Sequence, residues 1–495
     1  MARSFLSFTF ALAAATLMLF GAGAMPATAQ TGTATPGSGT SKQKQYPEVQ
    51  EAAQLLVGPK HDMAGAIKIL EAAARKYPEL PSAHVLMYQI LAQLNQGNAA
   101  RFELERAVHA APNDPEPYVI LGNIALQEKR VAEATMDFDK AKQLLATYTN
   151  AERKGAMEQQ AMSGIAQVAE VNEDWKEAES RLRELLRLAP KDLVAHQRLA
   201  RAMFQQGKAQ DAYDILKKAK AIDLANAQEP NGKEVFLTPE AIMAKFYDEF
   251  EGAGSKTGNA ELWFKAALKK APNDLPTRQV VAIWALDRGK IDFAKEQAEA
   301  ALKIEASDLK KYSGSNVGHM LCGLVGLWEK KWPDAEKYFE FIILENPNDF
   351  GARNNMALAL VEQSDPDKQR RALAYAEANY KDNKNSPDAL STLGWVYFRR
   401  NEFDQAGLAL DQAIKATGGN LTNPDTATYV AHILYHQDKK WQAKEILESI
   451  LKSGRPFSMR PEAEKLYEKV KDATKPAETT PAVTPTVPTT PAKTP

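Results

Sequence analysis

Apolar residues recur along this chain with the spacing of one face of an α-helix. An alanine is followed four positions later by a large apolar residue, and usually seven positions later by a small or apolar one. The alanines that mark this pattern are Ala66, Ala100, Ala134, Ala178, Ala212, Ala260, Ala294, Ala335, Ala372, Ala406 and Ala443. Five of the ten gaps between successive markers are 34 residues long, and the longest are 41, 44 and 48 residues. The pattern predicts a tandem array of helical repeats.

Two further features keep a fixed distance from the marker alanines. Proline stands twelve positions after five of them and thirteen after the last, at Pro78, Pro112, Pro190, Pro272, Pro347 and Pro456. Because proline cannot continue a helix, we expect it to close each repeat. Twelve positions before the marker the residue is usually Gly or Ala, as at Gly122, Gly323 and Gly394, which lets two helices approach closely. The sequence therefore predicts helical hairpins, with inserted loops near 148–154, 225–238 and 310–316.

These residues together resemble the tetratricopeptide repeat (TPR) family. The third repeat carries Tyr118, Leu121, Gly122, Ala134, Phe138 and Ala141, and the tenth carries Leu390, Leu393, Gly394, Tyr397, Ala406, Leu410 and Ala413. The resemblance covers roughly residues 46–451, and the 34-residue gap is the TPR period, although Gln54 and Asp248 depart from the small-residue position. It implies an all-α, right-handed superhelical solenoid of about eleven hairpins. It also implies a non-enzymatic protein whose concave groove binds a protein or peptide partner.

The segments outside the repeats predict export. Residues 1–29 have a positive start at Arg3, an apolar run and a small-residue site at Ala27–Ala29, which is typical of a signal peptide; an uncleaved membrane anchor remains the alternative. Residues 30–45 form a Gly/Thr/Ser/Pro leader and residues 473–495 a Pro/Thr-rich tail, and both contain too little apolar surface to form a core. The array itself spans 46–456, and 457–472 is predicted to be a capping helix. We expect a periplasmic, envelope-associated or secreted bacterial protein with no membrane segment after signal removal.

Composition argues against several kinds of chemistry. The 62 Lys and Arg residues are balanced by 63 Asp and Glu residues, so there is no basic excess to bind nucleic acid. The only cysteine, Cys322, excludes an internal disulfide and is predicted to be buried. His432 and His436 have a spacing found in zinc sites, but no third ligand accompanies them at motif spacing. The sequence predicts no catalytic, cofactor-binding or metal-binding residue.

The TPR register implies which residues line the groove, namely those fifteen, eleven, eight and seven positions before each marker alanine. In the amino-terminal half these are mostly amides, suited to hydrogen-bonding a peptide backbone: Gln89, Gln93, Asn123, Gln127, Ser163, Gln167, Gln197, Arg201 and Gln205. Toward the carboxyl end they become aromatic and mixed, as in binding hot spots: Met320, Leu324, Trp328, Ser391, Trp395, Phe398, Arg399, Thr428, His432, Tyr435 and His436. The alternative is that these aromatic rings pack inside the solenoid.

Other roles remain open at this level. An accessory or assembly factor for polysaccharide or protein export would also use an exported helical array. An enzyme with its site in an insertion such as 225–238 is a third possibility, which the lack of clustered Ser, His and Asp residues argues against. Self-association of the array is compatible with the sequence.

Overall fold

The computed structural model describes residues 46–57, 61–229, 234–251, 258–308, 312, 314–421 and 423–475. These residues form twenty-three α-helices and no strand, which confirms the all-α prediction. Among them, no helix is both long enough and apolar enough to cross a membrane. The predicted signal peptide (1–29), the leader (30–45) and all but the first residues of the tail (473–495) lie outside the described residues.

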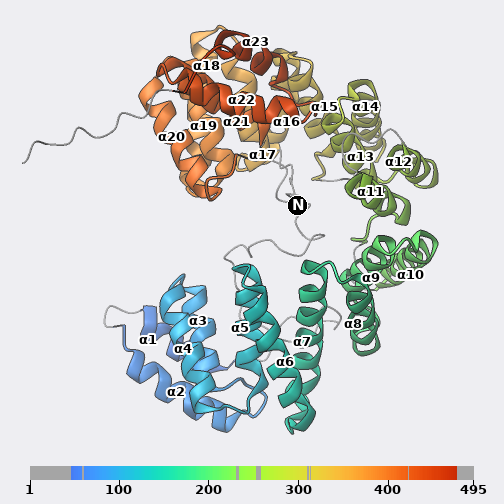
Figure 1. Ribbon diagram of the computed structural model, residues 1–495, viewed down its shortest axis with the longest axis vertical. Helices are drawn as coiled ribbons and strands as arrows, with labels where there is room; N and C mark the ends of the chain where they lie inside the picture. The colour runs from blue at the N-terminus through green and yellow to red at the C-terminus, as the bar shows by residue number, and fades with distance from the viewer. Residues whose placement is uncertain are drawn as a thin grey trace, which may run out of the picture. The chain divides into compact units, whose positions relative to one another are not determined.

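Successive helices pair into hairpins that fall into two compact units, and each unit is described by itself (Figure 1). The amino-terminal unit ends at Pro272 and has six hairpins: α1 (Pro47–Val57) and α2 (Met63–Lys76); α3 (Ala83–Gln93) and α4 (Gly97–Ala110); α5 (Pro115–Gln127) and α6 (Val131–Thr147); α7 (Ala151–Val171) and α8 (Trp175–Leu188); α9 (Leu193–Gln205) and α10 (Ala209–Ala227); α11 (Pro239–Glu251) and α12 (Asn259–Lys270). The carboxyl-terminal unit begins at Asn273 and has five: α13 (Leu275–Asp287) and α14 (Ile291–Ser307); α15 (Val317–Trp328) and α16 (Trp332–Glu345); α17 (Phe350–Val361) and α18 (Pro366–Asp382); α19 (Pro387–Arg399) and α20 (Phe403–Ala416); α21 (Pro424–His436) and α22 (Lys440–Lys452). A last helix, α23 (Arg460–Val470), follows them. The prediction of about eleven hairpins is confirmed.

The core of each hairpin forms around its marker alanine. All eleven marker alanines are buried, and the least buried, Ala260, is only 7% exposed. Phe138, four residues after Ala134, is fully buried, and a Cβ atom on Gly122 would come within 2.8 Å of its ring. Gly164 of the next hairpin is closer still, at 2.2 Å, so the ring is held between two glycine backbones. Cys322 is buried, as predicted.

Proline marks the end of the second helix in five hairpins. The helices α2, α4, α8, α12 and α16 each end two residues before Pro78, Pro112, Pro190, Pro272 and Pro347 respectively, because the residue before a proline avoids helical backbone angles. The helices α6, α10 and α14 have no proline at that position and run to 17, 19 and 17 residues. The predicted loop over 148–154 is therefore partly wrong, since α6 ends at Thr147 and α7 begins at Ala151.

The turn inside each hairpin has a recurrent backbone conformation. The residue five positions before the marker alanine has a positive φ in most hairpins: His61, Asn95, Lys129, Glu173, Gly207, Gly289, Lys330, Asn401 and Asp438. This left-handed residue ends the first helix and lets the chain reverse within a few residues. Most of these positions are not glycine, so the tight turn is formed at some conformational cost.

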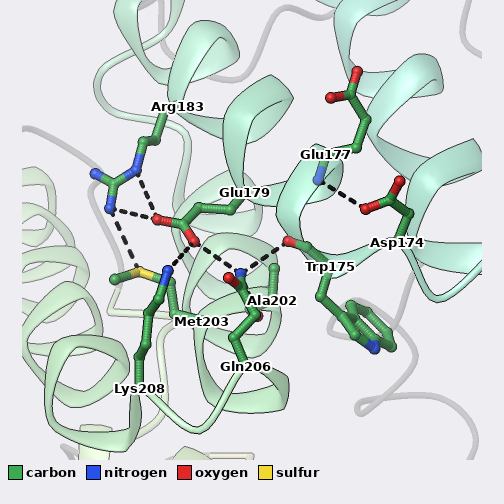
Figure 2. A network of polar contacts seen from close by, with 9 residues as sticks. All are labelled: Asp174, Trp175, Glu177, Glu179, Arg183, Ala202, Met203, Gln206 and Lys208. Atoms are coloured by element: carbon green, nitrogen blue, oxygen red, sulfur yellow. Dashed lines mark hydrogen bonds and ion pairs between the residues drawn. The ribbon is translucent and has the colours of Figure 1, made fainter.

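Polar contacts link one hairpin to the next at a fixed sequence distance. The carboxylate of Glu179, next to marker Ala178, accepts hydrogen bonds from Gln206 Nε2 at 2.8 Å, 27 residues later, and from Lys208 Nζ at 2.8 Å. Figure 2 shows these donors from the next hairpin converging on Glu179 together with Arg183 from its own helix. Burial alone would raise the pKa of Glu179, but the hydrogen bonds from Lys208, Arg183 and Gln206 outweigh it and lower the pKa to about 2.

The same contact recurs elsewhere with the same spacing. In the carboxyl-terminal unit, Glu336 accepts hydrogen bonds from Gln363, 27 residues later, at 3.0 Å, and from Lys368 at 2.7 Å. In the second hairpin the charges are exchanged, and Arg101 pairs with Glu128 at 3.2 Å. These side chains hold neighbouring hairpins in register.

Candidate interaction surfaces

The first helices of the amino-terminal unit carry a row of accessible amide side chains. Gln89 and Gln93 lie on α3, Asn123 and Gln127 on α5, Gln167 on α7 and Gln205 on α9. All six are half-buried or exposed. Within the described residues none of the six side chains makes a hydrogen bond, so their donors and acceptors are available to another molecule. We call these six residues the amide row.

The remaining predicted groove residues of this unit are engaged within the chain. Gln197 on α9 is buried, with 8% of its surface exposed. Arg201 on α9 forms an ion pair with Glu249 of α11. Ser163 on α7 accepts a hydrogen bond from Arg198 at 2.8 Å and is held between the two hairpins. Gln197 and Arg201 as partner contacts stay predictions.

In the carboxyl-terminal unit, the expectation that Trp395 presents an exposed ring is wrong. Trp395 is only 4% exposed. Its ring stacks on Tyr429 of α21 at 4.4 Å and on Phe398 at 5.2 Å, measured between centroids. Its indole N–H donates to Glu362 Oε1 at 2.8 Å, which satisfies the one polar atom of a ring that is otherwise surrounded by apolar groups. The alternative of packing inside the solenoid holds for this residue.

The other predicted residues of this unit differ in how exposed they are. Trp328, Phe398 and Tyr435 are half-buried, and Arg399 and His436 are exposed. Arg399 pairs with Glu362 at 3.1 Å, and the ring of His436 stacks on Phe403 at 3.5 Å. Their roles as partner contacts stay predictions.

The two histidines of α21 differ in surroundings. Burial lowers the pKa of His432 to about 4, so its ring is neutral at pH 7, and its Nε2 atom has no hydrogen-bond partner in the described part of the chain. His436 is instead exposed and lies against Phe403. Across the residues that the structure describes, no three His, Cys, Asp or Glu side chains gather closely enough to hold a metal ion.

A small polar cavity of about 40 Å³ lies between α17, α19 and α21, large enough for a few water molecules. Its walls are mostly amides, hydroxyls and carboxyls: Asn354, Asn355, Leu358, Asp388, Ser391, Thr392, Asn423, Asp425, Thr426 and Tyr429. Burial raises the pKa of both Asp388 and Asp425 to about 6. No sequence pattern predicted this cavity, because most of its lining residues fall outside the predicted groove positions.

Comparison with known families assigns the repeats. The model of the tetratricopeptide repeat family matches residues 60–124 and 172–228, which contain the marker alanines Ala66, Ala100, Ala178 and Ala212. These two stretches therefore contain tetratricopeptide repeats. A comparison with curated protein sequences found no match.

Three solved structures that are similar to this chain differ in how much of it they cover. A tetratricopeptide repeat protein from Parabacteroides merdae is 16% identical, covers 56% of this chain and 99% of its own, and has a TM-score of 0.35. Yeast Tom70 is 13% identical, with coverage of 86% and 95% and a TM-score of 0.34. A chain of the Cut9–Hcn1 hetero-tetramer of the APC/C is 14% identical, with coverage of 86% and 83% and a TM-score of 0.38.

Proposed function

We propose that this TPR protein is a non-enzymatic scaffold that captures a segment of a partner protein on the amide row of its amino-terminal unit. TPR repeats are protein-interaction modules, and the observation that carries the proposal is the row itself. Gln89, Gln93, Asn123, Gln127, Gln167 and Gln205 follow four successive first helices, and all six amides are accessible and lack hydrogen-bond partners within the described residues.

The chemistry of the row favours an extended peptide over a charged ligand. Each amide offers one acceptor and two donor hydrogens, which match the alternating C=O and N–H groups of an extended backbone. The one charged residue predicted among them, Arg201, is paired with Glu249. These hydrogen bonds depend on the backbone of the partner more than on its side chains. The partner segment would therefore be selected for an extended conformation.

The same proposal places the scaffold in the bacterial cell envelope. It is supported by the sequence of residues 1–29, with Arg3, the apolar run that follows and the Ala27–Ala29 site. Fusing residues 1–35 to a reporter enzyme that is active only outside the cytoplasm tests this part. Reporter activity together with a shortened fusion protein supports export with cleavage, and an inactive reporter contradicts export.

Binding is tested by affinity capture from an envelope extract, followed by titration calorimetry with the purified partner. The test variant replaces Gln93, Asn123, Gln127 and Gln167 with alanine. The control replaces Gln143 and Gln442, exposed amides on the second helices α6 and α22. Each lost hydrogen bond is worth about 1 kcal/mol, so the test variant should bind at least about tenfold more weakly while the control binds as the native chain does. Equal binding by all three proteins would show that the amide row is not the binding surface.

A further inference from the structure

The chain's own carboxyl-terminal segment, residues 455–462, packs against α21 and against the turns of the first two hairpins of the carboxyl-terminal unit. The segment leaves α22 through a turn at Gly454, where φ is +65°, and then leads into α23. Phe457 is 3% exposed, and Met459 lies against the apolar cluster that contains Trp395 and Tyr429. The segment therefore adds to the burial of the aromatic residues that the sequence assigned to an open groove.

Four contacts, at three places, anchor the segment to other hairpins of the unit. The Ser458 hydroxyl donates to Asp425 Oδ2 and the Met459 N–H donates to Asp425 Oδ1, both at 2.9 Å. Glu462 forms an ion pair with Lys330, in the turn between α15 and α16. Pro456 lies against the turn between α13 and α14, where a Cβ atom on Gly289 would come within 2.9 Å of the proline ring. The segment thus bridges the first, second and last hairpins of the unit.

The contacts at Asp425 are of the kind by which a protein binds a ligand. Asp425 is 6% exposed, and its two carboxylate oxygens are satisfied by donors from this segment. Met459 is the N-cap residue of α23, and its side chain makes no capping hydrogen bond. Asp425 supplies the missing anion at that end, where free N–H groups and the helix dipole favour negative charge.

Buried polar atoms of the segment and of the unit that it packs against lack hydrogen-bond partners. Glu462 Oε2, His432 Nε2 and Trp328 Nε1 are buried without a hydrogen-bond partner in the described residues. Glu362 also lies near Glu462, and burial raises the pKa of Glu362. A buried polar atom without a partner costs free energy. The segment is therefore held less tightly, and is released more easily, than a segment whose polar atoms are all paired.

We propose that residues 455–462 are an intramolecular ligand that covers this surface of the carboxyl-terminal unit and can be displaced from it. A partner of this surface must present the same chemistry: a hydroxyl and a backbone N–H for Asp425, and an acidic side chain for Lys330 at the start of a helix. This inference concerns a different unit from the amide row, and neither depends on the other.

The test uses the segment itself as the probe. A fluorescent peptide of residues 455–472 is titrated, by anisotropy, into a chain that ends at Gly454, into the full chain, and into a control chain that ends at Lys475. We expect binding to the chain ending at Gly454 to be at least a hundredfold tighter than to the other two, in which the site is occupied. A folded chain ending at Gly454 that does not bind the peptide, or a full chain that binds it equally well, would overturn the proposal.

Two substitutions establish that the bound peptide uses the native contacts. In the chain ending at Gly454, Asp425→Asn should weaken peptide binding at least tenfold. A peptide carrying Glu462→Lys should also bind weakly, and Lys330→Glu in the protein should restore its binding. Unchanged affinity in both cases contradicts the proposed site.

A measurement on the intact protein covers the case in which the chain ending at Gly454 does not fold. Amide hydrogen exchange in the full chain should be at least tenfold faster over residues 457–466 than over α21, because a displaceable segment opens without unfolding the helices beneath it. Equal protection of the two segments would show that residues 455–462 are a fixed part of the fold.

Discussion

The indole N–H of Trp395 donates to the carboxylate of Glu362, 33 residues earlier, at 2.8 Å. Arg399, one turn after Trp395 on α19, pairs with the other oxygen of the same carboxylate at 3.1 Å. One acidic residue in the turn between α17 and α18 is thereby fixed by two residues of the next hairpin. Because Trp395 also stacks on Tyr429 of α21, this relationship couples three successive hairpins.

Removing the indole donor should weaken the carboxyl-terminal unit. Trp395→Phe keeps an aromatic ring for the stack but leaves Glu362 Oε1 without this donor, and we expect a loss of about 1–3 kcal/mol. Urea unfolding followed by circular dichroism measures the change. Trp441→Phe is the control, because Trp441 is half-buried and its indole makes no hydrogen bond among the described residues, so it should change stability by less than about 1 kcal/mol. Equal effects of the two substitutions would contradict a structural role for the hydrogen bond.

Acid should weaken the contact between α8 and α9 through Glu179. The pKa of this carboxyl is about 2 in the folded chain against an ordinary value of 4.5, so its stabilisation is complete above pH 4.5 and is lost as the pH falls toward 2. Glu179→Gln should therefore cost up to about 3 kcal/mol at pH 7 and much less at pH 3, as urea titrations at the two pH values would show. Glu177→Gln, on the same helix but with a side chain 43% exposed, should show little pH dependence. A Glu179→Gln effect of the same size at both pH values would argue that its ionisation is irrelevant.

Two glycines of α7 should respond in opposite directions to alanine. A Cβ atom on Gly164 would come within 2.2 Å of the Phe138 ring, so Gly164→Ala should destabilise the amino-terminal unit by about 1–3 kcal/mol. Gly155 has nothing within 4 Å of the corresponding position, and Gly155→Ala should stabilise the helix by about 0.5–1 kcal/mol. Thermal unfolding measures the change in stability of each variant. A stabilising Gly164→Ala would contradict the close approach of the two hairpins.

The turn between α5 and α6 should improve when its left-handed residue becomes glycine. Lys129 is exposed and has φ of +61°, a conformation that costs a side-chain-bearing residue energy and glycine almost none. We expect Lys129→Gly to stabilise the unit by about 0.5–1 kcal/mol. Lys142→Gly, at an exposed position inside α6, should instead cost about 1 kcal/mol. The melting temperatures of the two variants should move in opposite directions.

The hairpins could be predicted from the sequence because their determinants are local and repeat in phase. The marker alanines, the glycine at 122 facing the ring at 138 and the prolines that end helices each act within one or two hairpins. The lengthening of α6, α10 and α14 could not be predicted from the missing proline alone. The helix α20 also lacks proline twelve residues after Ala406, and it still ends at Ala416. Local signals of this kind carry most of the fold.

The surfaces were harder to predict because they depend on contacts between distant residues. The amide row lies on the first helices as the register implied, but the burial of Trp395 results from Glu362, from Tyr429 and from the segment around Met459. No periodic feature marks Ser458 or Glu462, which follow the last repeat. A register can assign a side chain to one face of a helix, but it cannot show that another part of the chain covers that face.

The long second helices restrict how hairpins could be gained or lost from the array. They are α6, α10, α14 and α18 of the third, fifth, seventh and ninth hairpins, with 17, 19, 17 and 17 residues. The second helices between and beside them, α4, α8, α12, α16 and α20, have 14, 14, 12, 14 and 14 residues. From the second hairpin to the tenth, the length of the second helix therefore repeats every two hairpins, twice the period of the sequence motif. Loss or duplication of a single hairpin would place two long or two short helices side by side, whereas a change by pairs would keep the alternation.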